Sequence, residues 1–200
     1  MFVGRETELN KLNAMYQSNQ FEFAVLYGRR RVGKTTLINE FCKDKKTIFF
    51  VATESTGKEN LAQFSKCVLK SITGSEGDFS FSSYEDLFQY IDSICKKERL
   101  ILAVDEYPYL AESHKAISSL LQVHIDHMWK DSKLFLILCG SSMSFMENQV
   151  LGYKSPIYGR RTAQMKIHPF SYFEFRPMLE NFSQEEQAIL YGVTGGIPEY

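Results

Sequence analysis

Residues suited to phosphate chemistry lie near the start of the chain. Gly28 is followed by four residues and then by Gly33, Lys34 and Thr35, which is the spacing of a phosphate-binding loop. Glycines let the backbone curl so that successive N–H groups face one anion, and a helix that begins there adds partial positive charge. We therefore expect Lys34 to reach the β- and γ-phosphates of a nucleotide and Thr35 to ligate Mg²⁺.

The spacer of this loop is basic, because Arg29, Arg30 and Arg31 follow one another. The backbone N–H groups of such a loop face the anion, so we expect the three side chains to point largely away from it. Solvent screening and the charge of a bound nucleotide then moderate their mutual repulsion. We predict that one arginine folds back onto a phosphate, and that the others meet acidic groups on a lid, on another domain or on a partner.

A second candidate group of residues ends the apolar stretch LILAVDE, residues 100–106. Ligands of open α/β sheets bind at the carboxyl ends of the strands. We expect Asp105 to hold Mg²⁺, directly or through water, and Glu106 to polarise the water that attacks the γ-phosphate. A strand that ends in two acidic residues is common, so this interpretation depends on the phosphate-binding loop upstream.

Two further polar groups are candidates for contact with the γ-phosphate. Ser141 and Ser142 end the apolar run LCGSS, although Ser142 could instead only cap a helix. Arg160 and Arg161 precede the last predicted strand. An arginine beside the γ-phosphate stabilises the charge of the transition state, from the same chain or from a neighbour. The alternative for the arginines is an exposed pair in a loop.

Histidine and cysteine do not indicate a metal centre. His124 and His127 lie three residues apart with no third ligand at useful spacing, which favours helix packing or a solvated face. The cysteines are scattered, form no CxxC pair and are expected to be buried thiols of a reduced compartment. They are Cys42, Cys67, Cys95 and Cys139.

The elements that must position these residues alternate along the chain. Apolar runs and helical periodicities follow one another, which predicts an α/β fold with a mostly parallel sheet. The predicted strands are residues 21–28, 47–53, 99–106, 133–141 and 163–170. The predicted helices are residues 6–17, 35–41, 84–94, 117–129 and 183–191, and residues 73–83 are predicted to form a loop. After residue 170 the pattern changes to short helices.

Composition narrows the class of protein. The chain has 200 residues, 44% of them hydrophobic and 24% charged, and its net charge of -1 provides no overall excess of positive charge for nucleic acid. No stretch approaches the roughly 18 apolar residues of a membrane span. The N-terminus lacks the apolar run of a signal peptide. We expect a cytoplasmic protein without membrane association.

Taken together, the motifs resemble a known family. FVGRETEL, LYGRRRVGKTTL, LILAVDE, LCGSS, YGRR and GGIPEY occur in the order seen in the archaeal-type P-loop ATPase family, in the STAND-like branch near the AAA+ ATPases. The resemblance implies a three-layer P-loop NTPase sandwich with strand order 5-1-4-3-2. It also implies an ATPase core over residues 1–180 and the beginning of a helical lid over residues 181–200. Because such proteins usually continue into further domains, we expect the chain to be a fragment of a longer protein.

The resemblance also assigns roles to single residues. Val3, Gly4 and Arg5 would lie near the adenine, and Pro198 would approach it from the lid. The resemblance implies that Arg160 matches the family's Gly-Arg position better than Arg161, and that Ser141 or Ser142 is the sensing polar group. The implied phosphate and Mg²⁺ site consists of Gly28, Arg29, Arg30, Arg31, Val32, Gly33, Lys34, Thr35 and Thr36.

These features favour a module that binds ATP or ADP, hydrolyses ATP with Mg²⁺ and relays the nucleotide state to further domains of the same chain. Two alternatives stay open: a slow nucleotide-gated signalling switch with little turnover, and a DNA-associated ATPase. GTP is disfavoured because the chain has no convincing Asn-Lys-x-Asp motif, and a small-molecule kinase would not explain FVGRE or GGIP. A DNA or protein partner and a homo-oligomer are left open.

Overall fold

A single parallel sheet organises the molecule. The computed structural model describes residues 3–74, 77 and 79–199, so residues 75, 76 and 78 of the predicted loop lie outside the described part. The strands lie in the order β2-β3-β4-β1-β5, and all paired strands are parallel. This confirms the expected order 5-1-4-3-2. The strands are β1 (Glu22–Tyr27), β2 (Thr47–Val51), β3 (Leu100–Asp105), β4 (Leu134–Gly140) and β5 (Ala163–Lys166).

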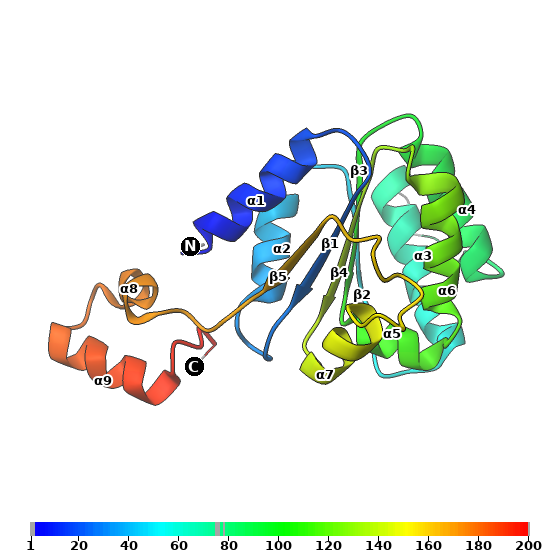
Figure 1. Cartoon of the computed structure of the whole chain (residues 1–200). Coiled ribbons are helices and arrows are strands. Elements are labelled where there is room, and N and C mark those ends of the chain that lie inside the picture. Colours follow the sequence, from blue (N-terminus) through cyan, green and yellow to red (C-terminus); the bar gives the residue numbers. More distant parts are fainter. Residues whose placement is uncertain (1–2, 75–76, 78, 200) are drawn as a thin grey trace.

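Helices cover both faces of the sheet, which gives three layers (Figure 1). One face carries α1 (Glu6–Gln17) and α2 (Lys34–Cys42), and the other carries α3 (Gly57–Thr73), α4 (Tyr84–Cys95) and α6 (Ile117–His124). This explains why β3 is apolar up to Val104 and β4 is apolar throughout, since every residue of both strands is buried.

Strand β1, which lies between β4 and β5, divides its side chains between two cores. Phe23, Val25 and Tyr27 pack on the side of α3, α4 and α6, and the intervening Ala24 and Leu26 pack on the side of α1 and α2. Successive side chains of a strand point to opposite faces, so one apolar strand anchors both layers. The loop that follows Tyr27 is therefore attached to a strand whose side chains are buried on both faces of the sheet.

Several helices differ from the sequence prediction. The predicted helix 117–129 is α-helical only to His124 and continues as a π-helix, Ile125–Trp129. Helical periodicity did not predict α3, which begins at a capping box between Thr56 and Glu59. It also did not predict α5 (Tyr107–Ser113) or the π-helix Met146–Val150. Helix α7 (Met143–Phe145) follows Ser142 directly, as in the alternative that places this serine before a helix.

The last helices pack on one another beside the sheet. They are α8 (Tyr172–Phe175), the 3-10 helix Arg176–Leu179 and α9 (Gln184–Thr194). The capping box predicted for α9 is present, because Ser183 and Glu186 exchange hydrogen bonds. The ring of Tyr191 on α9 lies 5.4 Å from that of Tyr172.

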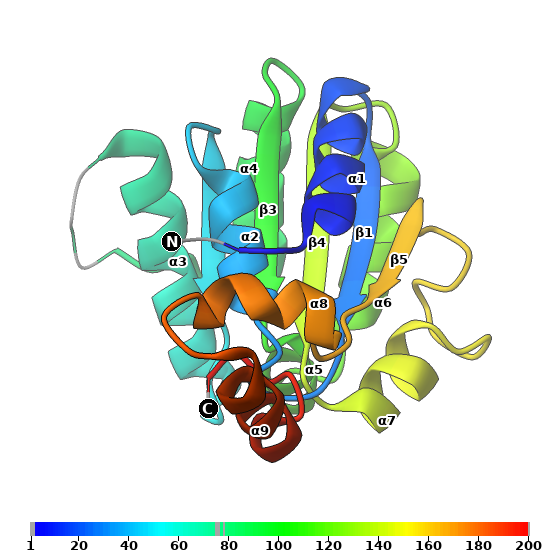
Figure 2. The ribbon, with the colours of Figure 1, turned by 90° about the vertical axis from the view of Figure 1, so that its left-hand side faces the viewer.

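Figures 1 and 2 place these helices near the end of the sheet at which β1 gives way to α2. Whether residue 181 marks the start of a separate lid domain stays a prediction. None of the helices in the described residues is both long and apolar enough to cross a membrane.

Candidate functional site

The loop between β1 and α2 depends on its two glycines. A Cβ atom on Gly28 would lie 2.2 Å from the carbonyl oxygen of Ile167, so only glycine fits beside the segment that follows β5. Gly33 has a φ of 87°, in the left-handed region that glycine adopts without steric cost. The loop thus curls tightly directly before Lys34, where α2 begins.

The Lys34 ammonium group lies inside this curl. Lys34 is only 5% exposed, and its Nζ donates hydrogen bonds to the carbonyl oxygens of Gly28, at 3.0 Å, and Arg29, at 2.8 Å. The positive charge is therefore held where the backbone of a phosphate-binding loop surrounds its anion.

Thr35 and Asp105 meet although they are far apart in the sequence. The Thr35 hydroxyl donates to Oδ2 of Asp105 at 2.5 Å, and Oδ1 of Asp105 accepts from the N–H of Glu106 at 2.9 Å. A hydroxyl and a carboxylate are oxygen ligands of the kind that Mg²⁺ prefers. Burial raises the pKa of the nearby Cys139 thiol well above its usual value, and Asp105 adds to this shift. The thiol therefore stays neutral beside the carboxylate.

Glu106 contacts the end of the neighbouring strand. Its Oε2 accepts hydrogen bonds from the Ser141 hydroxyl, at 2.9 Å, and from the Ser141 N–H, at 3.3 Å. Glu106 has a φ of 49°, a left-handed conformation that is uncommon for a residue with a side chain. Ser142 is exposed, and its side chain makes no capping hydrogen bond to α7. Of the two serines, the structure brings Ser141 to the carboxylates.

The three arginines of the loop point in different directions. The Arg30 guanidinium donates to the Tyr109 hydroxyl on α5 at 2.9 Å, and Nε of Arg31 lies 3.6 Å from Oε2 of Glu199. The Arg29 side chain is exposed, while its carbonyl group accepts from Lys34. Arg31 thus meets an acidic group near the end of the described chain, as the sequence led us to expect for part of the triplet.

Two adjoining cavities lie over the loop. The first, of about 180 Å³, is lined by Arg30, Arg31, Gly33, Lys34, Thr35, Thr36, Glu106 and Glu199. The second, of about 270 Å³, is lined by Val3, Arg5, Gly33, Thr36, Phe170, Met178, Pro198 and Glu199. Val3, Arg5 and Pro198, expected near an adenine, are thus brought together in one cavity. Sequence reasoning assigned no role to Phe170, Met178 or Glu199, although Glu199 belongs to the GGIPEY motif.

Arg5 ties the N-terminal segment to this site. Its side chain is 5% exposed, and its guanidinium donates to the carbonyl oxygens of Val32, at 3.1 Å, and His168, at 2.5 Å. The same group lies 4.0 Å from the centre of the Phe170 ring. Burial lowers the pKa of Arg5. Gly4 is needed beside it, since a Cβ there would lie 2.7 Å from the Phe170 ring.

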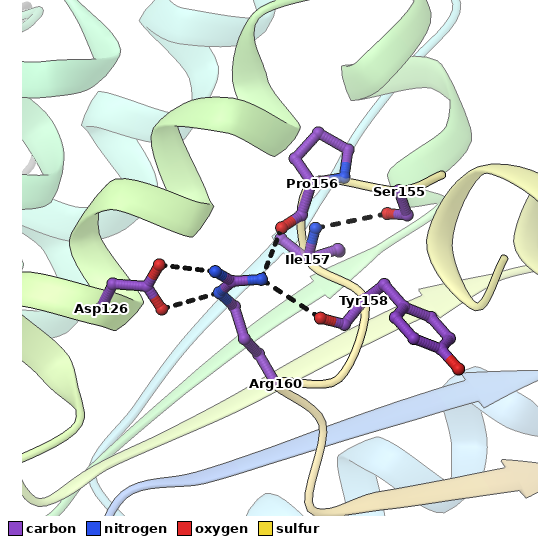
Figure 3. Close-up of polar contacts among 6 residues, drawn as sticks. All are labelled: Asp126, Ser155, Pro156, Ile157, Tyr158 and Arg160. Carbon is purple, nitrogen blue, oxygen red and sulfur yellow. Dashed lines mark hydrogen bonds and ion pairs between the residues drawn. The ribbon is translucent and has the colours of Figure 1, made fainter. Parts of the chain in front are cut away.

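Val32 and Arg160 lie outside both cavities. The Val32 side chain is fully buried in the core on the side of α1 and α2. Nε and Nη2 of Arg160 donate to the two carboxylate oxygens of Asp126, at 2.7 and 2.6 Å, and Nη1 donates to the carbonyl oxygens of Pro156, at 2.8 Å, and Tyr158, at 3.1 Å (Figure 3). These partners hold the Arg160 guanidinium away from the two cavities over the phosphate-binding loop. The catalytic role of Arg160 stays a prediction.

The register of β5 explains this position. Residues 163–166 of β5 pair with residues 24–27 of β1, so Arg160 lies toward the opposite end of β1 from the loop. The Arg160 guanidinium lowers the pKa of Asp126, chiefly through their hydrogen bonds, and the pKa of Arg160 is raised in turn. The pair therefore holds the segment before β5 against the π-helix that continues α6.

The histidines on the apolar stripe pack as predicted for a helix. His124 is fully buried, with its ring 5.3 Å from the rings of Phe88 and Trp129. Its Nε2 lies 3.3 Å from Oε1 of Glu85. His127 is exposed. The four cysteines are free thiols.

Sequence comparison connects this chain with proteins of Methanocaldococcus jannaschii. An uncharacterised protein of Methanocaldococcus jannaschii, MJECL04, is 36% identical over all 200 residues of the chain, which cover 43% of that protein. An uncharacterised ATP-binding protein of the same organism, MJ0423, is 50% identical over 46 residues, which are 23% of this chain and 78% of the relative. The chain therefore spans less than half of the longer relative.

Solved structures share the fold. The Walker-type ATPase PABY2304 of Pyrococcus abyssi matches with a TM-score of 0.74 and 21% identity, over 98% of this chain and 65% of that one. The ORC2 protein of Aeropyrum pernix, solved in ADPNP–ADP complexes, matches with a TM-score of 0.64 and 17% identity, over 88% and 50% of the two chains. At these identities the matches show the fold alone.

The family is established by a sequence model that covers the chain almost from end to end. The model describes an ATPase domain predominantly from Archaea, and it matches residues 2–200. The order of the motifs, the strand order and the loop geometry agree with this match. The chain belongs to the family of ATPase domains found predominantly in Archaea.

Proposed function

We propose that the chain binds ATP together with Mg²⁺ and hydrolyses it to ADP and phosphate. One observation carries the proposal: Lys34, Thr35 and Glu106 line a single cavity, and Thr35 is hydrogen-bonded to Asp105. A cation, a hydroxyl and a carboxylate line one small polar cavity, and a second carboxylate bonds that hydroxyl; these are the groups that phosphoryl transfer to water requires.

Each group has a distinct role in this proposal. Lys34 binds the β- and γ-phosphates, while Thr35 and Asp105 would hold Mg²⁺, which neutralises phosphate charge when bound. Glu106 accepts a proton from the attacking water and orients it. Ser141 holds the Glu106 carboxylate from the adjacent strand. Val3, Arg5 and Pro198 contribute to the cavity that would receive the base.

A slow nucleotide-gated switch is the second candidate, and the contact between Ser141 and Glu106 favours it. Oε2 of Glu106 already accepts two hydrogen bonds from Ser141, which fill its acceptor sites, so this oxygen is not free to orient an attacking water. Turnover would then be slow unless Ser141 released Glu106. Steady-state phosphate release, measured with and without DNA, distinguishes rapid hydrolysis from slow switching.

The partners of the module belong to the same proposal. One neighbour in fold is the ORC1 protein of Aeropyrum pernix, solved in complex with DNA, at 19% identity. Because the chain spans 43% of MJECL04, we propose that further domains of a longer protein receive the nucleotide signal. Stimulation of phosphate release by DNA would support a DNA partner, and an unchanged rate would count against it.

Replacing Lys34 with alanine tests nucleotide binding. We expect Lys34→Ala to weaken ATP binding at least tenfold, because the loop loses its buried cation. Isothermal calorimetry gives the affinity, and Lys43→Ala is the matched control, since Lys43 is exposed at the end of α2. An unchanged affinity in a folded Lys34→Ala protein would refute the phosphate-binding role of the loop.

A further inference from the structure

Glu199 lies at the junction of the two cavities. Gly33, Thr36 and Glu199 line both of them, whereas the other lining residues belong to one cavity only. A nucleotide that places its phosphates in the cavity over Lys34 places its base in the neighbouring cavity. The sugar connects base and phosphates, so it must lie beside the three shared residues.

Glu199 has the chemistry to bind a sugar at this position. Gly33 offers no side chain and Thr36 offers one hydroxyl, whereas a carboxylate accepts hydrogen bonds on two oxygens. Hydrogen bonds to an ionised acceptor are stronger than those between neutral groups. The vicinal 2′- and 3′-hydroxyls of ribose present two donors that match the two carboxylate oxygens.

Arg31 makes a carboxylate compatible with nearby phosphates. A negative side chain this close to a triphosphate would repel it, but Oε2 of Glu199 lies 3.6 Å from Nε of Arg31. The arginine belongs to the phosphate-binding loop, so it both offsets the charge of Glu199 and keeps the carboxylate near the site. Pro198, directly before Glu199, lines the base cavity and places the segment beside it.

We propose that Glu199 recognises the ribose hydroxyls of the bound nucleotide and makes the site selective for ribonucleotides over nucleotides that lack these hydroxyls. This inference rests on the proposed ATP-binding function and specifies which sugar the site accepts.

The test compares ATP with 2′,3′-dideoxyATP by calorimetry in the presence of Mg²⁺. We expect the full chain to bind ATP about tenfold more tightly than the dideoxynucleotide. The difference is of this size because the ribose hydroxyls would donate hydrogen bonds to the charged, partly exposed carboxylate of Glu199. Glu199→Ala should bring this ratio close to one by weakening ATP binding, with the dideoxynucleotide affinity unchanged within about twofold. Glu199→Gln, which keeps one acceptor oxygen, should give an intermediate ratio.

The control is Glu185→Ala, which removes the same charge from an exposed position in the first turn of α9 and should keep the wild-type ratio. A ratio near one in the wild type, or an unchanged ratio in Glu199→Ala, would overturn the assignment. Tighter binding of both nucleotides by Glu199→Ala would also overturn it, because the carboxylate would then act only as a repulsive charge. If the wild type bound neither nucleotide, the proposed function itself would fail.

Discussion

At the scale of single residues, the carboxylate of Glu106 is the group on which turnover should depend. It lines the cavity over the phosphate-binding loop, and Ser141 holds it through two hydrogen bonds from the neighbouring strand. Asp105, one residue earlier, bonds Thr35 instead. Two adjacent carboxylates thus have separate partners, which supports separate roles in metal binding and in activation of water.

Replacing Glu106 with glutamine should separate binding from hydrolysis. The amide keeps the shape of the side chain but cannot accept a proton, so we expect ATP affinity to change less than threefold while phosphate release falls about 100-fold or more. A coupled phosphate-release assay and calorimetry measure the two effects. Glu112→Gln, at an exposed position on α5, should leave both unchanged. Undiminished release by Glu106→Gln would exclude this residue as the base.

At the scale of elements, the ion pair between Arg160 and Asp126 joins the segment before β5 to the π-helix that extends α6. The pair is bidentate, and its side chains are 25% and 33% exposed. Arg160 also donates to two carbonyl oxygens of its own segment. An arginine with these contacts supports the fold of the segment whether or not it acts on a nucleotide elsewhere.

The stability from this pair should depend on pH. The folded protein has a lowered pKa at Asp126, so the contribution is present above the ordinary aspartate pKa of about 3.9 and is lost as the pH falls through the lower folded value. We expect Asp126→Asn to lower the free energy of unfolding by about 1 kcal/mol at pH 7. In urea unfolding, this difference from the wild type should shrink at acidic pH.

Asp131→Asn serves as the control for this prediction, since Asp131 is exposed in the turn that follows the π-helix. The free energy of unfolding of Asp131→Asn should match that of the wild type at pH 7 and at acidic pH. If the difference in free energy of unfolding between the wild type and Asp126→Asn stayed constant from neutral to acidic pH, the charge of Asp126 would not contribute to stability through its pair with Arg160.

Sequence predicted the elements whose signal is local. Apolar runs identified all five strands, and the glycine spacing identified the loop, because each pattern is contained in one short segment. Helix α3 was missed since its buried face includes the polar residues Asn60 and Ser65, which interrupt the apolar stripe. Asn60 is buried because it exchanges hydrogen bonds with the backbone of Thr53, a contact that periodicity does not reveal.

The candidate site was predicted in the same uneven way. Thr35 and Asp105 belong to two separate recognisable motifs, and the structure joins them by a hydrogen bond. Phe170 and Glu199 reach the site only because segments distant in sequence converge there, and this depends on the tertiary fold.

At the scale of the whole molecule, a close backbone contact joins the segment after the C-terminal helices to the segment that follows β5. The N–H of Phe170 donates to the carbonyl oxygen of Gly196 at 2.9 Å, and the Tyr191 hydroxyl donates to the carbonyl oxygen of Phe170 at 3.3 Å. Phe170 also lines the base cavity. The arrangement of α9 and the shape of the base cavity therefore depend on the same contact.

Adding one methyl group at Gly196 should disturb both the position of α9 and the cavity that would receive the base. A Cβ there would lie 2.1 Å from the carbonyl oxygen of Phe170, and Gly196 has a φ of 71°. We expect Gly196→Ala to lower the free energy of unfolding by about 2 kcal/mol and to weaken ATP binding. Denaturant unfolding and calorimetry measure the two losses.

Gly192 provides the matched control for this substitution. It lies within α9, and a Cβ there would meet nothing within 4 Å. Gly192→Ala should be neutral or stabilising by about 0.5 to 1 kcal/mol, because alanine favours the helix. If Gly196→Ala changed neither stability nor affinity, the contact with Phe170 would not couple the helices to the cavity.

The position of β1 in the sheet also has a consequence for synthesis on the ribosome. The partners of β1 are β4 and β5, and roughly a hundred residues separate β1 from the first of them. At about 5–20 residues per second, β1 leaves the ribosome roughly 5 to 20 seconds before β4 is complete. The nucleotide-binding loop, which follows β1, is thus made well before the two strands that hold β1 in the sheet. During this interval the apolar β1 is a segment that a chaperone would recognise.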